Sequence, residues 1–383
     1  MDLPLELLEL IFQMLCLDDA MNCRATCRSW RKAADAIFSS QLPLMLSLST
    51  PSTSSYIWPW ILKSDNNFFG SLSAPWSNHD STVLTEKWPH GINRSDNRVQ
   101  SVQGWLMFNI FHYEWATGQS FSKLSFFNPF SRARFRLPKL FLFSREPCYY
   151  QVRVAFNSAP PGSEEFVVAF LFVFSYQENK KQRLAFIKLK QGSWIESIET
   201  DEIFYDIQVD DDNKLYGLTF KHGTSVVFVF TLGDNHRDDH VVERLVMLNT
   251  IQDTDAVGRF IFSYASFKRS HQMVMDTSTG ELLIVRHDLN ASVRNGCYDS
   301  IRIKGFSVFK LDRSNLRWCE VFDIGDRFLF WDFTNVSLVS AKGLRLAEQF
   351  KSGNCIFFCH ASTSQECPGS QIQEHDMGVF FLG

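Results

Sequence analysis

The chain has 383 residues, of which 45% are hydrophobic and 15% are aromatic, with 37 phenylalanines. That length suits one small module and one large domain, or two medium domains, with enough apolar residues for a sizeable core. The formal net charge of −4 argues against nucleic acid or an anionic membrane as a partner. The nine cysteines are an odd number at irregular spacing, so we expect reduced thiols rather than a disulfide framework.

The N-terminal residues do not have the pattern of an export signal. Glu6 and Glu9 stand where a signal peptide is basic, and no small-residue cleavage site follows. The longest apolar run, residues 166–174, is much shorter than the roughly 20 residues that span a bilayer. We therefore expect a protein of the cytoplasm, the nucleus or both, with no membrane segment.

Residues 2–38 begin with a helix that is apolar around most of its circumference. Asp2 can cap this helix, and Pro4 is tolerated in the first turn because its missing N–H would be unpaired there. At about 100° per residue, the leucines, Ile11, Phe12 and Met14 cover about 220° of the helix, where a surface helix usually shows a stripe little over 100° wide. The first helix is therefore predicted to bury two faces.

Two shorter helices are predicted to follow. The second contains Cys23 and Cys27, which we interpret as small buried residues of one helix, and the third begins near Ser29 and carries Trp30. These helices can cover one face of the first. A unit of about 40 residues buries too little surface to cover both faces, so we expect another protein to cover the second one.

Almost every segment after residue 42 has strand signals. Two continuous apolar runs, 166–174 and 226–230, are typical of strands covered on both faces. Short turns also indicate two hairpins, which join residues 186–190 to 194–198 and residues 306–311 to 316–321.

The predicted fold class is therefore α+β multidomain. A small three-helix module at residues 1–40 precedes a mainly-β domain at residues 41–383. About 340 residues of short strands exceed an ordinary sandwich, so we predict a six- or seven-bladed β-propeller, with two ordinary β domains as the alternative. The last strand, residues 377–382, is expected to pair with residues 42–48 and close the ring.

The helical segment resembles an F-box. The similarity includes Asp2-Leu3-Pro4, Ile11-Phe12 and the run from Cys23 to Arg31, and it covers nearly all of residues 2–38. In that family the motif binds a Skp-type adaptor, which links it to a cullin–RING ubiquitin ligase. The resemblance implies that the adaptor contact, or its immediate support, comes from nine positions. They are Leu3, Pro4, Leu7, Leu8, Ile11, Leu15, Leu17, Cys27 and Trp30.

The rest of the chain is similar to the plant KIB-like F-box proteins. The similarity covers most of residues 100–383, whereas residues 42–100 match weakly. The segments that carry it are Gly104-Trp105-Leu106, Phe127-Asn128-Pro129 with Leu137-Pro138, 306–321 with 324–327, 353–358 and 376–380. The resemblance implies a β-propeller-like domain that recognises a protein target.

The sequence carries no catalytic signature, since Gly-x-Ser-x-Gly, His-Glu-x-x-His, a P-loop and a dinucleotide fingerprint are all missing. A loose group of possible metal ligands has no standard zinc spacing, and we interpret it as core packing. Its members are Cys355, Cys359, His360, Cys367 and His375. Asp210-Asp211-Asp212 is interpreted as an acidic turn before a strand. We therefore assign no catalytic residue, cofactor or metal.

These features predict a non-catalytic substrate-recognition subunit of an SCF-type (Skp–cullin–F-box) E3 ubiquitin ligase. The F-box binds the Skp-type adaptor and the β domain binds a target protein, so that ubiquitin transfer depends on proximity. Two alternatives stay open. One is an F-box scaffold that sequesters a partner without ubiquitination. The other is a propeller enzyme, which requires convergent carboxylates or a His–carboxylate pair in its central channel.

Overall fold

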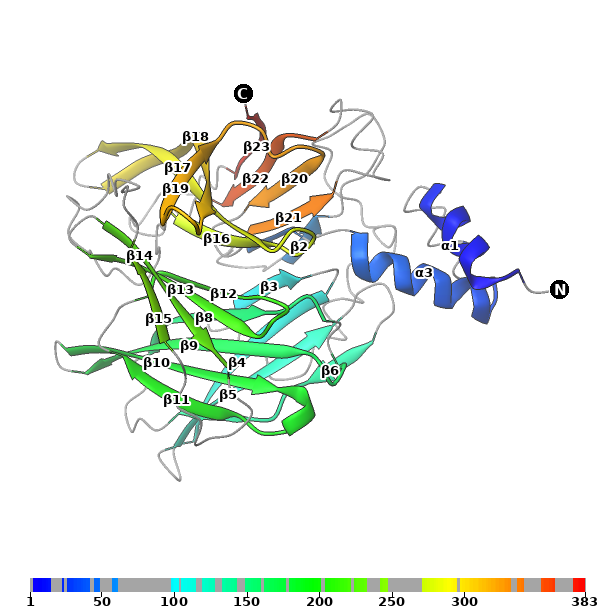
Figure 1. The fold of residues 1–383 in the computed structure, drawn as a ribbon, viewed down its shortest axis with the longest axis horizontal. Helices are drawn as coiled ribbons and strands as arrows, with labels where there is room; N and C mark the ends of the chain where they lie inside the picture. Colours follow the sequence, from blue (N-terminus) through cyan, green and yellow to red (C-terminus); the bar gives the residue numbers. More distant parts are fainter. Residues whose placement is uncertain are drawn as a thin grey trace.

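The structure is a computed structural model (Figure 1). It describes residues 3–14, 23, 26–41, 45–48, 57–60, 98–102, 105–114, 119–127, 133–142, 149–159, 162–176, 179–200, 204–221, 224–232, 242–246, 271–294, 297–331, 336–340, 353–361 and 375–382. Strands greatly outnumber helices in these residues. None of the helices among them is long and apolar enough to cross a membrane.

Two helices at the N-terminal end pack against each other beside the sheets (Figure 1). Helix α1 spans Leu5–Met14 and helix α3 spans Arg28–Gln41, which confirms the first and third predicted helices. Most of the predicted second helix lies outside the described residues. The prediction that Cys27 is buried inside it is wrong, because Cys27 is exposed and lies between a turn at Thr26 and the start of α3.

The described strands form five sheets of four or five strands and one two-stranded sheet. Sheet 1 has the order β3-β4-β5-β6, and β7 also pairs with β5. Its strands are β3 (Arg98–Val102), β4 (Trp105–Glu114), β5 (Gln119–Phe127), β6 (Arg134–Arg136) and β7 (Leu140–Leu142).

Sheets 2, 3 and 4 are antiparallel meanders in which each strand pairs with the next in the chain. Sheet 2 contains β8 (Tyr149–Phe156), β9 (Val167–Tyr176), β10 (Asn179–Lys188) and β11 (Ile195–Thr200), with the short 3-10 helix η1 (Leu189–Gln191) before β11. Sheet 3 contains β12 (Asp206–Val209), β13 (Lys214–Lys221), β14 (Thr224–Thr231) and β15 (Val242–Val246). Sheet 4 contains β16 (His271–Asp276), β17 (Glu281–Arg294), β18 (Cys297–Asp312) and β19 (Arg317–Val321).

Sheet 5 departs from this simple meander. Its strands are β20 (Arg327–Trp331), β21 (Val336–Ser340), β22 (Cys355–Ala361) and β23 (His375–Phe381). Their order is β21-β20-β22-β23, and β20 pairs with β22 in parallel. A parallel pair requires a crossover connection between its strands. Here the connection from β20 to β22 contains strand β21.

Edge strands of sheets 2 to 5 lie next to one another. Strand β12 lies against β8 on one side and β16 on the other, and β16 lies against β21. The two-stranded sheet consists of β1 (Met45–Leu48) and β2 (Ile57–Trp60), and β1 lies against both β22 and β3. The sheets therefore follow one another in chain order, with β1 between the last sheet and the first (Figure 1).

The predicted pairing of the last strand with residues 42–48 is wrong. Strand β23 pairs with β22, and Phe381 lies opposite Cys355. Strand β1 pairs with β2 in a local hairpin. Closing a short hairpin loses less chain entropy than joining strands more than 300 residues apart. The smaller entropy loss favours the local partner for β1.

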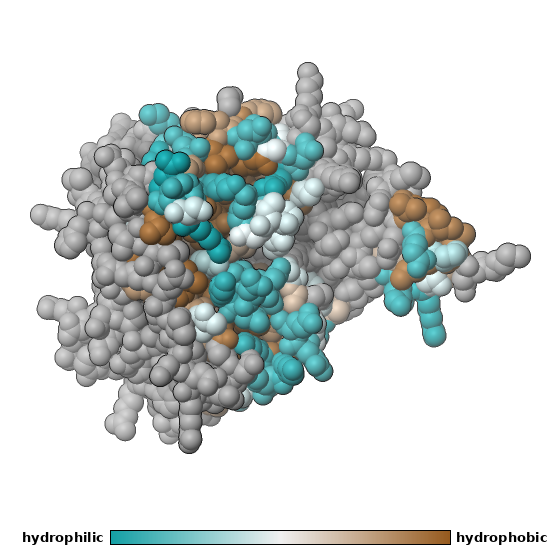
Figure 2. All heavy atoms as spheres, viewed as in Figure 1, coloured by the Kyte–Doolittle hydropathy of each residue, from teal (hydrophilic) through white to brown (hydrophobic). Residues whose placement is uncertain are grey.

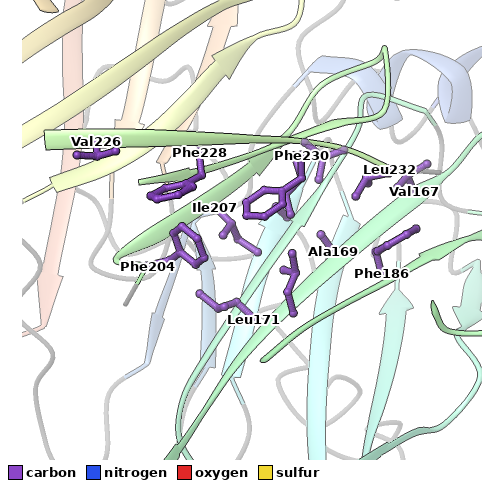
Figure 3. Packing of buried hydrophobic residues seen from close by; sticks show 14 residues of the cluster. Val167, Ala169, Leu171, Phe186, Phe204, Ile207, Val226, Phe228, Phe230 and Leu232 are labelled. Carbon is purple, nitrogen blue, oxygen red and sulfur yellow. The ribbon is translucent and has the colours of Figure 1, made fainter. Parts of the chain in front are cut away.

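The continuous apolar runs are strands covered on both faces, as predicted. In β9, Val167, Ala169 and Leu171 pack toward sheet 3, whereas Val168 and Phe170 pack toward sheet 1. Successive side chains of a strand point to opposite faces, so an unbroken apolar run fills two interfaces. Figure 3 shows the cluster between sheets 2 and 3.

Strand β14 repeats the pattern one sheet further on. Phe228 and Phe230 pack against Phe204, with ring centroids 5.5 and 5.9 Å from it. Val227 and Val229 pack toward sheet 4. A further cluster, between sheets 4 and 5, contains Trp331 and its neighbours. Apolar clusters thus join each sheet to the next.

Both predicted hairpins and the acidic turn are confirmed. Strands β10 and β11 pair around η1, and β18 pairs with β19. The backbone N–H of Lys214 donates to the Asp210 carboxylate at 2.8 Å, and the Tyr216 hydroxyl donates to the same carboxylate at 2.8 Å. These contacts are those of a tight turn that joins β12 to β13.

Candidate functional site

The wide apolar sector of α1 is divided between a buried face and an exposed face. The helix begins directly after Pro4, whose carbonyl accepts hydrogen bonds from the N–H groups of Leu7 and Leu8 at 3.1 and 3.2 Å. Leu8 and Phe12, one turn apart, are buried. The ring of Phe12 meets the indole of Trp30 edge to face, with centroids 5.6 Å apart.

The opposite face of α1 is apolar and exposed to solvent. Leu3, Leu7 and Leu10 are 43%, 47% and 56% exposed. Leu7 and Leu10 are three residues apart in α1, which places them within about 60° of one another around the helix axis. Leu3 precedes the first residue of the helix by two positions. Figure 2 shows hydrophobic atoms gathered over α1, at the end of the molecule away from the sheets. We call these three side chains the leucine face.

Helix α3, which packs against α1, has an N-terminal end that carries positive charge. Arg28, Arg31 and Lys32 of α3 are exposed, and no acidic residue lies in the first turn of that helix. The macrodipole makes the N-terminal end of a helix unfavourable for cations. Acidic groups beside these side chains would relieve this unfavourable placement.

The nine positions that the F-box resemblance implies differ in how far their side chains are exposed. Leu3, Pro4, Leu7 and Cys27 are exposed, Ile11 and Trp30 are half-buried, and Leu8 is fully buried against α3. The side chains of Leu15 and Leu17 lie outside the described residues. Leu10, the most exposed member of the leucine face, is missing from the nine, although the helical periodicity alone places it on the same arc as Leu3 and Leu7.

Buried polar residues connect the first strands of sheets 2, 3 and 4. The Arg153 guanidinium lies 3.6 Å from the Asp206 carboxylate, and both side chains are only 8% exposed. Asp206 also accepts a hydrogen bond from the N–H of Met273 at 2.7 Å, and the Gln208 amide donates to the carbonyl of Met273 at 2.8 Å. Burial raises the pKa of Asp206, and Arg153 and the backbone N–H groups oppose that rise.

A histidine lies at the start of the neighbouring strand. Burial, together with the nearby Arg286 and His287, lowers the pKa of His271 to about 3. Its ring lies 4.8 Å from that of Phe220, so its described contact is aromatic. The contacts of Arg153, Asp206 and Gln208 join strands β8, β12 and β16 to one another. These polar side chains therefore have a structural role.

The possible metal ligands that the sequence offers are only partly described. Cys355 is completely buried in β22, and burial raises the pKa of its thiol to about 12. Such a thiol resists the deprotonation that a metal requires of a cysteine ligand. The side chains of the other four candidates lie outside the described residues, and the described residues contain no cluster of three metal-binding side chains.

Comparisons with known proteins agree with this architecture. The F-box-like family matches residues 1–40, and the KIB1-4 beta-propeller family matches residues 69–381. The F-box protein At3g56470 of Arabidopsis thaliana is 29% identical over 161 residues, which are 42% of this chain and 34% of that protein. The chain thus spans about a third of that relative's length.

One solved structure, the beta-propeller domain of the Trilobed protease from Pyrococcus furiosus with an open velcro topology, covers 70% of this chain and 87% of that chain. Its sequence identity is 10% and its TM-score is 0.28.

An F-box-like region followed by a β-propeller domain defines the class: this is an F-box protein. Within that class, the chain belongs to the KIB-like family of plant F-box proteins, because the KIB1-4 beta-propeller match covers most of its length.

Proposed function

We propose that this protein is the substrate-recognition subunit of an SCF-type E3 ubiquitin ligase and has no catalytic activity of its own. Residues 1–40 form the adaptor-binding module and residues 41–383 the target-binding domain. The observation that supports this most directly is the leucine face, in which three large apolar side chains are exposed, two on α1 and one just before it. Burying such a face in another protein stabilises the complex by the transfer of apolar area out of water.

The proposed partner at this face is a Skp-type adaptor, which connects the chain to a cullin–RING ligase. Leu3, Leu7 and Leu10 supply the apolar contact, while Leu8 and Phe12 hold α1 against α3 from the other side. Arg28, Arg31 and Lys32 face acidic residues of the adaptor. Because adaptor and target bind different parts of the chain, ubiquitin transfer depends on the local concentration of target lysines near the conjugating enzyme.

The proposed target-binding domain is a propeller of six blades, the smaller of the two numbers expected from the sequence. Five of the blades are sheets 1 to 5, and β1 and β2 belong to the sixth. The position of β1, against both β22 and β3, supports this count. We propose that the protein acts in the cytoplasm, the nucleus or both.

Co-purification of the full chain with a Skp-type adaptor tests the docking proposal. Leu7→Glu combined with Leu10→Glu should abolish the complex, because each substitution buries a charge without a partner. Phe141→Glu is a matched control, since Phe141 in β7 is 46% exposed and Leu7 is 47% exposed. Full adaptor binding by the α1 variant, or equal loss in the Phe141 variant, would show that the leucine face is not the docking site.

A reconstituted ligase assay tests the later step. With adaptor, cullin, RING protein and conjugating enzyme present, a target captured by the chain should be ubiquitinated only when the cullin is included. A target that is captured but never modified would favour a scaffold that sequesters its partner. Modification that persists without the cullin would contradict the non-catalytic assignment.

A further inference from the structure

The two most exposed large hydrophobic side chains of the described residues belong to neighbouring segments of sheet 5. Phe322, in the loop before β20, is 64% exposed, and Phe381, at the end of β23, is 58% exposed. They are 59 residues apart in the chain. The hydrogen bonds of one side chain bring their backbones together.

That side chain is Asn354. Its amide nitrogen donates to the carbonyl of Phe322 at 3.3 Å and to the carbonyl of Leu382 at 2.8 Å, so both oxygens lie within hydrogen-bonding distance of a single atom. Its amide oxygen accepts from the N–H of Ile324 at 2.9 Å. Ile324 and Leu382 are buried, and each exposed phenylalanine is thus close in sequence to a residue anchored in the core.

The surrounding backbone is tightly held. Gly353 has a φ of +95°, and a Cβ there would lie 2.7 Å from the Arg327 nitrogen and 2.8 Å from the Gly325 oxygen. The N–H of Gly325 donates to the Asp323 carboxylate at 2.7 Å. A rigid surface with exposed aromatic rings loses little entropy when a partner binds, which is a property of binding hot spots.

The charged residues closest in sequence to Phe322 are acidic. Glu320, Asp323 and Asp326 are exposed. The two cations of segment 317–327 have partners within the chain: Arg317 bonds to Asp312 at 3.3 Å and Arg327 to Asp276 at 2.5 Å. The segment therefore presents uncompensated negative charge to solvent next to its exposed aromatic ring.

We propose that Phe322, Phe381 and the carboxylates of Glu320, Asp323 and Asp326 form a docking surface for a basic segment of the target protein. The occupant is an extended stretch in which lysine or arginine alternates with large apolar side chains. The apolar side chains contact the two rings and the cations pair with the carboxylates. A second copy of this chain fits poorly, because a symmetric contact places carboxylates against carboxylates. This inference rests on the proposed function, since it specifies the chemistry of the target.

Fluorescence anisotropy with the full-length chain tests the proposal. The probe is a short labelled peptide in which lysine alternates with leucine, and the comparison peptides carry glutamate for lysine or serine for leucine. The Lys/Leu peptide should bind at low salt and weaken as salt rises. Phe322→Ser combined with Phe381→Ser should weaken binding by about tenfold, as loss of a hot spot does. Phe141→Ser, which removes an exposed phenylalanine from sheet 1, should leave binding unchanged.

A charge variant separates the two parts of the surface. Glu320→Gln with Asp326→Asn keeps both rings and should reduce both the affinity and its salt dependence. The proposal would be overturned if the Glu/Leu peptide bound equally well, or if the serine and charge variants had no effect. An equal loss of binding in Phe141→Ser would overturn it too. So would sedimentation showing that the phenylalanines instead hold two copies together. Adaptor co-purification of the same variants should stay normal, so a failure of the adaptor model is detected independently of the peptide result.

Discussion

The edge of the Phe12 ring meets the indole of Trp30, and this contact joins α1 to α3. Both helices are short, and helices of this length depend on packing rather than on intrinsic propensity. The orientation of the leucine face therefore depends on a contact on the opposite side of the same helix.

Phe12→Ala tests this dependence. The substitution leaves a cavity between α1 and α3, and deletions of this size in a core cost about 3–5 kcal/mol. We expect faster hydrogen exchange throughout α1 and α3, unchanged exchange in β9, and loss of adaptor binding. Leu10→Ala serves as the control, because its side chain is exposed and its removal should leave exchange unchanged. Full protection of α1 in the Phe12 variant would contradict this account.

Charge reversal at the start of α3 separates binding from stability. Glutamate near a helix N-terminus is favourable by about 0.3–1 kcal/mol, so Arg28→Glu with Arg31→Glu should preserve or increase the protection of α3 from hydrogen exchange. The same change should weaken adaptor binding and reduce its salt dependence. Arg28→Lys with Arg31→Lys retains the charge and should bind nearly as well. Weaker binding together with a less protected helix would instead indicate a folding defect.

Asp276 should contribute acid-sensitive stability. Burial raises the pKa of this carboxyl, but hydrogen bonds from Ser278 and Thr279 and the charge of Arg327 outweigh it, and the net pKa lies below the ordinary value of 3.8. A lowered carboxyl pKa stabilises the folded state above the unfolded pKa, and that stability is lost as the pH falls through the folded value. Asp276→Asn should therefore lower the unfolding free energy at neutral pH by about 1.5–3 kcal/mol, as loss of hydrogen bonds to a charged group does.

The comparison is made by urea unfolding at neutral pH and at a pH well below 3.8. The difference between wild type and Asp276→Asn should shrink in acid. Asp312→Asn is the control, because Asp312 also accepts hydrogen bonds from the turn that follows it and pairs with an arginine, but its side chain is 25% exposed where that of Asp276 is 5% exposed. We expect a much smaller effect there. A constant difference across the pH range would show that Asp276 acts through packing rather than through its charge.

Gly353 and Gly280 provide a test of steric fit. Both have positive φ, +95° and +70°, but a Cβ at Gly280 has nothing within 4 Å, whereas one at Gly353 meets the backbone of residues 325 and 327. Gly280→Ala should cost about 1–2 kcal/mol from the left-handed conformation alone. Gly353→Ala should cost clearly more and should also weaken peptide binding at Phe322 and Phe381. Equal thermal unfolding midpoints for the two variants would contradict the close approach at Gly353.

The sequence was sufficient for the features that depend on local periodicity. The run at residues 166–174 predicted a strand covered on both faces, and β9 divides its side chains between two clusters as that pattern requires. The wide apolar sector of the first helix predicted two covered faces, and within the part of the chain that the structure describes only one face is covered, at Leu8 and Phe12. Periodicity predicts these features because it depends only on neighbours along the chain.

The features that sequence reasoning missed depend on contacts distant in the chain. Arg153 and Asp206 lie on different sheets, and neither has a sequence neighbour that indicates the pair. The order β21-β20-β22-β23 requires a parallel pair that no local turn specifies. The sequence marks Asn354 only as part of segment 353–358, which carries the family resemblance, whereas its side chain holds residues 322, 324 and 382. Cys27 was assigned to a helix from its spacing with Cys23, but a turn at Thr26 separates the two.

The end of α3 at Gln41 and the start of β1 at Met45 leave only three residues between the helices and the sheets. Three extended residues reach about 10 Å, and β1 itself lies between β22 and β3. In an assembled ligase, so short a tether would hold a captured target at a nearly fixed offset from the adaptor. Lysines would then be selected by their position on the target's surface, and lengthening the tether would broaden which of them receive ubiquitin.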